Sequence, residues 1–278
     1  MPKTIVTHIN PDLDAITACW LLVRFGGNEF ADATFGFVPA GERLEDEDNN
    51  SVHVDTGLGK FDHHQPDRGR EDTCAATLVY EWLVHKRRIQ DQEALRRMVD
   101  VVNDLDHMRN FFWDDPGNDR YEFFLGSLLN GLKLGGHVKN DHELVDFGMR
   151  CLEGLYTAFK IKVAAEEDLK KGIVFETTWG KTLALESKND ETIKLGIKSG
   201  YRVVARRDPE SGMVRIKGAP LEEINLKSVY EKIREADPDA TWYFHPGGHM
   251  VLNGSIRNPK MRPSKLSLDE VITLLKSA

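Results

Sequence analysis

The chain has 278 residues, of which 40% are hydrophobic and 9% aromatic, and its formal net charge is −8 at pH 7. This length exceeds that of a typical single domain, and the composition is typical of a globular protein rather than a disordered or fibrous one. No apolar run approaches a membrane span, no signal peptide precedes the first predicted strand, and three cysteines without CxxC spacing argue against a disulfide framework and a structural zinc site. We therefore expect a cytoplasmic protein with reduced thiols.

The predicted elements of the first half alternate between short β-branched segments and helical patterns. In chain order they are strands at 4–9, 34–38, 51–55 and 60–63, and helices at 13–25, 75–88, 92–105 and 121–132. This alternation predicts a parallel sheet with flanking helices, in which ligands gather at the carboxyl ends of the strands. The fold class is therefore α/β.

A long helical pattern covers residues 141–171 and ends before Gly172, which makes it a candidate connector between domains. Beyond it, strands at 173–178, 181–186, 201–206 and 213–217 and helices at 226–235 and 268–276 predict a second, smaller α/β unit. We thus predict three parts, at 1–140, 141–172 and 173–278.

The formal charge divides unevenly between the two halves. The first 175 residues carry about −11 and the remaining residues about +3. Metal ions would offset part of the negative charge, while the second half is suited to hold a phosphate or an oligonucleotide end. The overall pI near 5.7 argues against a long nucleic-acid footprint.

Histidines and carboxylates occur at the ends of three successive predicted strands. They are His8, Asp12 and Asp14 on the first strand-to-helix turn, Asp55 at a later strand end, and Asp62, His63 and His64 at the next. Hard divalent cations such as Mn²⁺ and Mg²⁺ prefer carboxylate oxygens with an occasional imidazole, which is the ligand set found here. The arrangement predicts a two-metal site.

These blocks together resemble the DHH phosphoesterase superfamily, because a His-x-x-x-Asp-x-Asp turn, a lone strand-end Asp and an Asp-His-His triplet follow in the same order. The segment His245-Pro246-Gly247-Gly248-His249, with Asn253-Gly254-Ser255 after it, is similar to the glycine-rich signature of the DHHA1 substrate domain, except that Pro246 stands where relatives often have glycine. The resemblance implies a DHH metal-binding catalytic domain at 1–140, a helical connector at 141–172 and a DHHA1-like substrate-binding domain at 173–278.

The resemblance also implies the metal ligands. His8 and Asp12 would hold one Mn²⁺ ion, and Asp14 with His63 would hold a second; Mg²⁺ or Co²⁺ are alternatives. Asp55 is the natural bridging ligand, since one carboxylate has an oxygen for each metal. Two such cations supply a nucleophile from water and neutralise the charge that builds on the phosphoryl oxygens.

A further aspartate is expected after the triplet, and Asp104 and Asp106 are the candidates. Residues two apart on a helix diverge by roughly 200°, so both cannot face the site. We favour Asp106, with Asp104 as the alternative. Asp62 is expected to orient a triplet histidine. The last histidine of the triplet faces substrate in the superfamily, so His64 would bind the phosphate or protonate a leaving oxygen.

Substrate binding is expected from the glycine-rich segment. Gly247 and Gly248 would let backbone N–H groups approach an anion, and His249 and Arg257 would add donors.

The other histidines and aromatic residues have less specific roles. His53 shares a strand face with Asp55 and is expected to pack behind the site. His107 follows Asp106 and could reach the site, but a position on the surface is the expected one. Four aromatic residues could form a base-stacking platform, but we expect them to pack in the core instead. They are Trp82, Phe111, Phe112 and Trp113.

The leading hypothesis is a Mn²⁺- or Mg²⁺-dependent phosphoesterase that hydrolyses phosphodiester bonds of short oligonucleotides or nucleotide-like substrates. One alternative is an inorganic pyrophosphatase or polyphosphatase, and another is a non-catalytic DHH-like scaffold or binding module. The expected partner is a small phosphorylated substrate or a short oligonucleotide, with no membrane, and a homodimer is left open.

Overall fold

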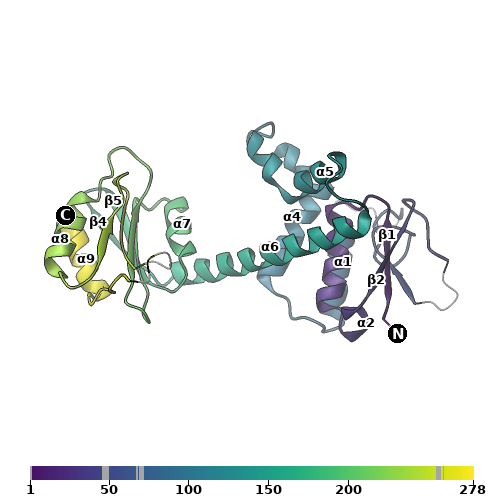
Figure 1. Ribbon diagram of the computed structural model, residues 1–278, viewed down its shortest axis with the longest axis horizontal. Helices are drawn as coiled ribbons and strands as arrows, with labels where there is room; N and C mark the ends of the chain where they lie inside the picture. The colour runs from purple at the N-terminus through teal and green to yellow at the C-terminus, as the bar shows by residue number, and fades with distance from the viewer. Residues whose placement is uncertain (1, 46–49, 67, 69–71, 255–257, 259) are drawn as a thin grey trace. The chain divides into compact units, whose positions relative to one another are not determined.

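The computed structural model describes residues 2–45, 50–66, 68, 72–254, 258 and 260–278. The chain divides into two compact units, Met1–Lys160 and Ile161–Ala278, and helix α6, Asp141–Leu169, crosses the boundary between them (Figure 1). Among the described residues, no helix combines the length and the apolar character that crossing a bilayer requires.

The first unit is built on a three-stranded parallel sheet. Strands β1 (Thr4–His8), β2 (Thr34–Val38) and β3 (Ser51–His53) lie in the order β2-β1-β3. The middle residues of β1 are buried, as expected for the central strand of a parallel sheet. The predicted parallel sheet is therefore confirmed.

The strand predicted at 60–63 is wrong. This segment contributes one isolated bridge, between Val54 and Phe61, in the described part of the chain. The reason is a tight turn before it, in which the N–H of Leu58 donates to Oδ2 of Asp62 at 2.7 Å and the N–H of Asp62 donates to the carbonyl of Gly59. The N–H groups of Leu58 and Asp62 are therefore engaged within the turn and do not pair with a neighbouring strand.

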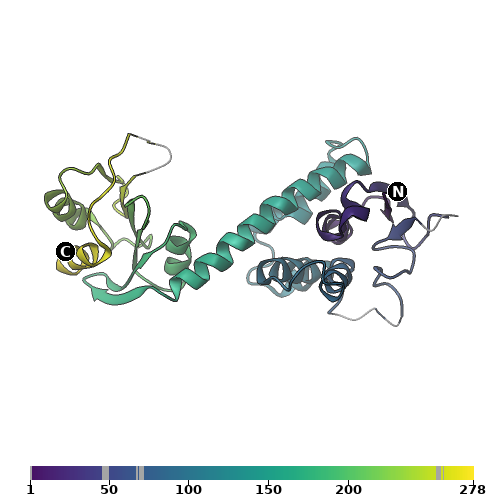
Figure 2. The same ribbon diagram turned by 90° about the horizontal axis from the view of Figure 1, so that it is seen from below.

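Helices cover the sheet of the first unit. They are α1 (Leu13–Phe25), α2 (Asn28–Ala31), α3 (Ala75–His85), α4 (Glu93–Asp106) and α5 (Leu125–Leu134), with the 3₁₀ helices η1 (Arg109–Phe112) and η2 (Asp119–Phe123). Figure 2 shows α1, in dark purple, between α6 and the blue helices α3 and α4. The single helix predicted at 121–132 is instead η2 followed by α5, because Phe124 is extended, with φ −75° and ψ 150°.

The second unit contains a six-stranded mixed sheet in the order β4-β5-β6-β7-β9-β8. Its strands are β4 (Ile173–Thr177), β5 (Gly180–Glu186), β6 (Val203–Arg207), β7 (Val214–Gly218), β8 (Trp242–Phe244) and β9 (Met250–Asn253). β5 and β6 are parallel, and the other neighbours are antiparallel. The predicted α/β class of this unit is confirmed.

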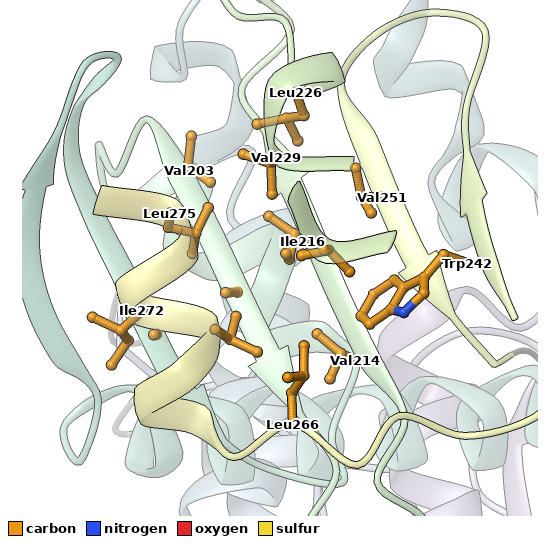
Figure 3. Close-up of a cluster of buried hydrophobic side chains, with 14 of the residues drawn as sticks. Val203, Val214, Ile216, Leu226, Val229, Trp242, Val251, Leu266, Ile272 and Leu275 are labelled. Carbon is orange, nitrogen blue, oxygen red and sulfur yellow. The ribbon is translucent and has the colours of Figure 1, made fainter. Parts of the chain in front are cut away.

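Both faces of this sheet are covered, as the side chains of β6 show. Val203 and Ala205 point into the core cluster under α8 (Lys227–Ala236) and α9 (Leu268–Ser277), part of which is drawn in Figure 3. Val204, between them, packs in a second cluster with Ile193 of α7 (Glu191–Lys198). Because neighbouring strand residues face opposite sides, α7 lies across the sheet from α8 and α9 (Figure 1).

The sequence reading missed α7, β8 and β9. These elements have eight, three and four residues, and so each offers less than the window over which a helical or strand period is distinct. β8 and β9 flank the segment 245–249, so the glycine-rich motif forms the turn of a hairpin.

Gly148 of α6 gives a test of the packing in the first unit. A Cβ atom there would lie 2.7 Å from Cγ2 of Ile16, which is fully buried on α1 and cannot move away. We expect Gly148→Ala to lower the free energy of unfolding by about 1 to 3 kcal/mol. Gly154→Ala is the matched control, because a Cβ at Gly154 meets nothing within 4 Å, and it should stabilise the helix slightly. Urea denaturation followed by circular dichroism measures both; equal effects would contradict this packing.

Candidate metal centre

The first group of predicted site residues lies on the turn from β1 to α1. β1 ends at His8, and Asn10 takes a left-handed conformation with φ 55°. Asp12 caps α1, since its Oδ1 accepts a hydrogen bond from the N–H of Ala15 at 3.0 Å. Asp14 follows in the first helical turn and is buried. One turn thus carries an imidazole and two carboxylates at the carboxyl end of the sheet.

Asp55 occupies the carboxyl end of β3 in a constrained conformation. Its φ is 53°, which a residue other than glycine adopts at a cost of roughly 1 to 2 kcal/mol. Its N–H donates to the carbonyl of Phe61 at 2.9 Å, which holds the turn in place. The side chain is only 4% exposed. Left-handed residues of this kind cluster at functional sites, where the surrounding fold maintains the strain.

The carboxylate of Asp55 lies between two imidazoles, one facing each oxygen. Nε2 of His8 is 3.3 Å from Oδ2, and Nε2 of His63 is 3.4 Å from Oδ1. Burial would raise the pKa of Asp55, but His63 and His8 outweigh it and hold the pKa below its ordinary value. His8 Nδ1 donates to the carbonyl of Ile9 at 2.9 Å, so in the neutral ring Nε2 carries the lone pair.

The same carboxylate raises the pKa of both histidines. For His8, burial lowers the pKa, but the hydrogen bond to Asp55, the carbonyl of Ile9 and the charges of Asp55 and Asp12 raise it to about 9. For His63, the contact with Asp55 is the largest effect, and together with the nearby acids it overcomes burial and raises the pKa to about 9. Without a metal ion, therefore, the imidazoles of His8 and His63 carry protons at neutral pH.

Two further carboxylates approach His63. Oδ2 of Asp106 lies 3.7 Å from its Nε2 and Oδ2 of Asp14 lies 3.9 Å away. Burial, with the charges of Asp55 and Asp106, raises the pKa of Asp14 well above its ordinary value, and burial raises the pKa of Asp106 as well. Buried carboxylates this close repel one another unless a positive charge lies among them.

Asp14 also holds a neighbouring helix. Its two oxygens accept hydrogen bonds from the N–H groups of Ala75 at 2.7 Å and Ala76 at 2.8 Å, at the start of α3. These contacts fix the carboxylate and replace the side-chain cap that α3 lacks at Cys74. The sequence reading gave Asp14 a metal-binding role and did not anticipate this second contact.

The structure distinguishes the two candidates for the later aspartate. Asp104 accepts a hydrogen bond from Arg109 at 2.9 Å, and its side chain is 37% exposed. Asp106, the last residue of α4, faces His63 and is 17% exposed. The geometry therefore brings Asp106 to the site and leaves Asp104 outside it.

Asp62 and His64 form a hydrogen-bonded pair beside these groups. Asp62 is fully buried, and its Oδ1 accepts hydrogen bonds from the backbone N–H of His64 at 3.1 Å and from the ring Nδ1 at 2.9 Å. The ring of His64 is 61% exposed and lies beside that of His63. Because Nδ1 is held by Asp62, the Nε2 atom is the one left to meet a substrate.

His107 joins the cluster, which was the alternative to its expected position on the surface. Its Nδ1 is 3.6 Å from Oδ2 of Asp106, and its ring centre is 6.0 Å from that of His63. His63, Asp106 and His107 offer ligand atoms within 4.8 Å of one another. The adjacency of His107 to Asp106 at the end of α4 is the signal that pointed to it.

The residues present fit a pair of divalent cations. Asp55 belongs to two groups of residues whose ligand atoms lie within 4.8 Å of one another. One group is His8, Asp12 and Asp55, and the other is Asp55, His63 and His64. Oδ1 of Asp55 and Nε2 of His63 are buried without a hydrogen-bond partner among the described residues. A cation would satisfy both atoms, and carboxylates mixed with imidazoles suit Mn²⁺ or Mg²⁺.

The glycine-rich segment borders a basic cavity of about 420 Å³ within the second unit. Gly247 and His249 line it, while Gly248 is buried with φ 78° and shapes the turn. The cationic and imidazole groups of this basic cavity are Lys194, Lys198, Lys217, His245 and His249. Arg257, which we predicted to bind substrate, and Ser255 lie outside the described residues.

A second cavity, of about 520 Å³, lies within the first unit and opens on the candidate metal ligands. We call it the aromatic cavity, because it is lined by Asp12, Asp14 and Asp106 together with Phe111, Tyr121 and Phe124. Core packing, the expected role of Phe111 and Phe112, is wrong: these side chains are 63% and 90% exposed, and η1 has no buried residue.

Two other expectations agree with the structure. Trp82 packs against Phe30 and Phe61 at ring distances of 6.2 and 5.4 Å. His53 is buried, and its Nε2 accepts a hydrogen bond from the N–H of Leu44 at 2.9 Å, so it supports the fold behind the site.

Comparisons with known proteins find likeness in solved structures. No protein-family model matches the chain, and no curated protein matches it. Two structures of RecJ from Thermus thermophilus, one with Mg²⁺ and one with Mn²⁺, are each 13% identical to this chain. Their TM-scores are 0.35 and 0.34. Each match covers 99% of this chain, and the two matches cover 49% and 52% of the RecJ chains. This chain therefore spans about half the length of those RecJ structures.

A further similar structure is described as the DHH domain of a member of the s1p family of ribosomal proteins. It is 13% identical, with a TM-score of 0.30 over 99% of this chain and 86% of that one. At these TM-scores the likeness says nothing about what this chain binds or hydrolyses.

A matched pair of substitutions tests the choice between the two aspartates. We expect Asp106→Asn to weaken Mn²⁺ binding at least about tenfold, the loss typical even for groups behind the ligands. Asp104→Asn should leave Mn²⁺ binding at the wild-type value, because it removes only an exposed contact with Arg109. Isothermal titration calorimetry measures both, and a larger loss in Asp104→Asn would reverse the assignment.

The raised pKa values predict how the stability of the metal-free protein depends on pH. Folded His8 and His63 keep their protons up to about pH 9, whereas in the unfolded chain they lose them near 6.5. The folded state therefore binds more protons across this window, so stability should fall as pH rises from 6.5 to 9. The melting temperature in chelator, measured across that range, should fall less in His8→Gln than in wild type. A stability that rises with pH would contradict these assignments.

Proposed function

We propose that this chain is a metal-dependent phosphoesterase that hydrolyses phosphodiester bonds in short oligonucleotides or nucleotide-like substrates. The observation that carries the proposal is the position of Asp55, whose two oxygens face His8 and His63 while further carboxylates surround the pair. A carboxylate in this position can offer one oxygen to each of two ions, and a pair of ions about 3.5 to 4 Å apart supports the hydrolysis of phosphoesters.

The ligands divide around Asp55 into two sets. His8 and Asp12 would hold one ion, and Asp14, His63 and Asp106 the other, with Asp55 shared. Mn²⁺ is the favoured ion, and Mg²⁺ or Co²⁺ are compatible with the same donors. When bound, the two ions would make a nucleophile available from water and neutralise charge on the phosphoryl group.

His64 is suited to act on the substrate rather than on a metal ion. Asp62 fixes its ring through Nδ1, and the exposed Nε2 can bind a phosphate oxygen or give a proton to the leaving oxygen. Asp62 is a positioning residue, because it is fully buried and acts only through His64 and the turn that it closes.

The basic cavity of the second unit would hold a part of the substrate remote from the scissile bond. Lys198, Lys217 and His249 provide donors for a phosphate, and the backbone at Gly247 allows close approach without a side chain. Contacts of this kind are made alike in the ground state and the transition state, so they would govern KM more than kcat.

The two alternative functions receive less support from the residues. A pyrophosphatase needs a pocket rich in lysine and arginine, whereas the aromatic cavity carries Lys133 beside three aromatic rings. A scaffold does not require carboxylates gathered as closely around His63 as Asp14, Asp55 and Asp106 are, because they repel one another when charged.

A hydrolysis assay with a ligand variant tests the proposed function. Purified protein in EDTA should not hydrolyse pNpN dinucleotides, and Mn²⁺ should restore turnover. We expect Asp55→Asn to lose turnover at saturating Mn²⁺ while keeping the wild-type circular dichroism spectrum, because it removes the shared charge and changes almost no volume. Cyclic dinucleotides, 3′-phosphoadenosine 5′-phosphate and pyrophosphate complete the panel. Full activity in EDTA, or wild-type turnover by Asp55→Asn, would contradict the proposal.

A further inference from the structure

The aromatic cavity is lined both by candidate metal ligands and by aromatic rings. Asp12, Asp14 and Asp106 belong to its lining, and so do Phe111, Tyr121 and Phe124. All of these residues belong to the first unit. A phosphate held beside the carboxylates would therefore have one of its ester groups next to aromatic rings.

The aromatic wall is held in position by its own contacts. The rings of Tyr121 and Phe124 meet edge to face at 5.3 Å, and Trp113 packs against both at 6.0 and 5.7 Å. The hydroxyl of Tyr121 donates to the carbonyl of Asp114 at 2.5 Å, which fixes the ring. A preformed wall of this kind binds a flat group with little loss of conformational entropy, because its side chains are already ordered.

Phe111 supplies an exposed face at the same cavity. Its side chain is 63% exposed, so the face of the ring is accessible to a ligand in the cavity. Asn110, Asn130 and Ser127 add amide and hydroxyl groups to the lining. An apolar wall with a few polar groups is the usual make-up of a small-molecule site, and about 520 Å³ falls within the usual size range.

We propose that the aromatic cavity binds the nucleobase of the nucleotide next to the scissile phosphate, with Phe111 as a stacking surface; this rests on the proposed function. A nucleobase combines a flat apolar face with hydrogen-bonding edges, which matches the aromatic rings and the amides of the lining. Pyrophosphate has neither feature and would leave the rings uncovered. The cavity therefore selects a nucleotide substrate over an inorganic one.

The test combines a base-free substrate with two neighbouring substitutions. Dinucleotides are compared with analogues in which a tetrahydrofuran abasic residue replaces one base, in the first or the second position. Phe111→Ala removes the cavity ring, and Phe112→Ala is the matched control, because Phe112 is 90% exposed on the same short helix and does not line the cavity. Neither ring is buried, so both variants should fold.

We expect wild-type protein to lose about 5- to 150-fold in kcat/KM when the base at one position is removed, the range that a stacked base supports. Phe112→Ala should show the same preference. Phe111→Ala should hydrolyse the two substrates at nearly equal rates. Indifference of the wild type to both abasic positions, or equal behaviour of the two variants, would overturn the proposal.

Binding of a fluorescent base separates this proposal from the proposed function. If wild-type protein hydrolyses no dinucleotide, the hydrolytic function fails, and a dinucleotide that carries 2-aminopurine then tests the cavity alone in Mg²⁺. Fluorescence quenching by wild type and Phe112→Ala, but not by Phe111→Ala, would support base binding. Equal fluorescence with all three proteins would overturn it.

Discussion

The site depends on the buried negative charge of Asp55, which His8 and His63 share as their common partner. A carboxylate that is 4% exposed needs positive charge on both sides, and the two nearest groups are the imidazoles of His8 and His63. Their raised pKa values and the lowered pKa of Asp55 express this one interaction. In the metal-free protein, the protonated imidazoles supply this positive charge. Divalent cations would supply more of it, because several other carboxylates lie close to Asp55.

The fold brings these charges together through the ends of β1 and β3. Parallel pairing of Val6 with His53 aligns the two strand ends, so that His8 and Asp55 leave the sheet at the same edge. Asp14 then connects the site to the first residues of α3. Substitution of this aspartate would therefore disturb both the ligand set and the start of a helix.

The sequence predicted the part of the site that depends on local order. The end of a strand, the start of a helix and the spacing of His8, Asp12 and Asp14 are local features, and they pointed to the turn that the structure contains. The division into separate units was predicted for a similar reason, because each half has its own periodic pattern.

What could not be predicted depends on contacts between segments. Asp104 is held away from the site by Arg109 of the following turn, and the sequence alone does not show that pairing. Phe111 was expected in the core because apolar character predicts burial on average, yet none of the residues of η1 is buried. The same exposure makes this ring a candidate surface for substrate.

Anomalous diffraction from Mn²⁺-soaked crystals tests the central claim most directly. Two manganese peaks should flank Asp55, one next to His8 and Asp12 and the other next to Asp14, His63 and Asp106. Both peaks should weaken together in Asp55→Asn crystals, since that carboxylate serves both ions. A single peak, or two peaks that do not contact Asp55, would contradict the account of a shared carboxylate.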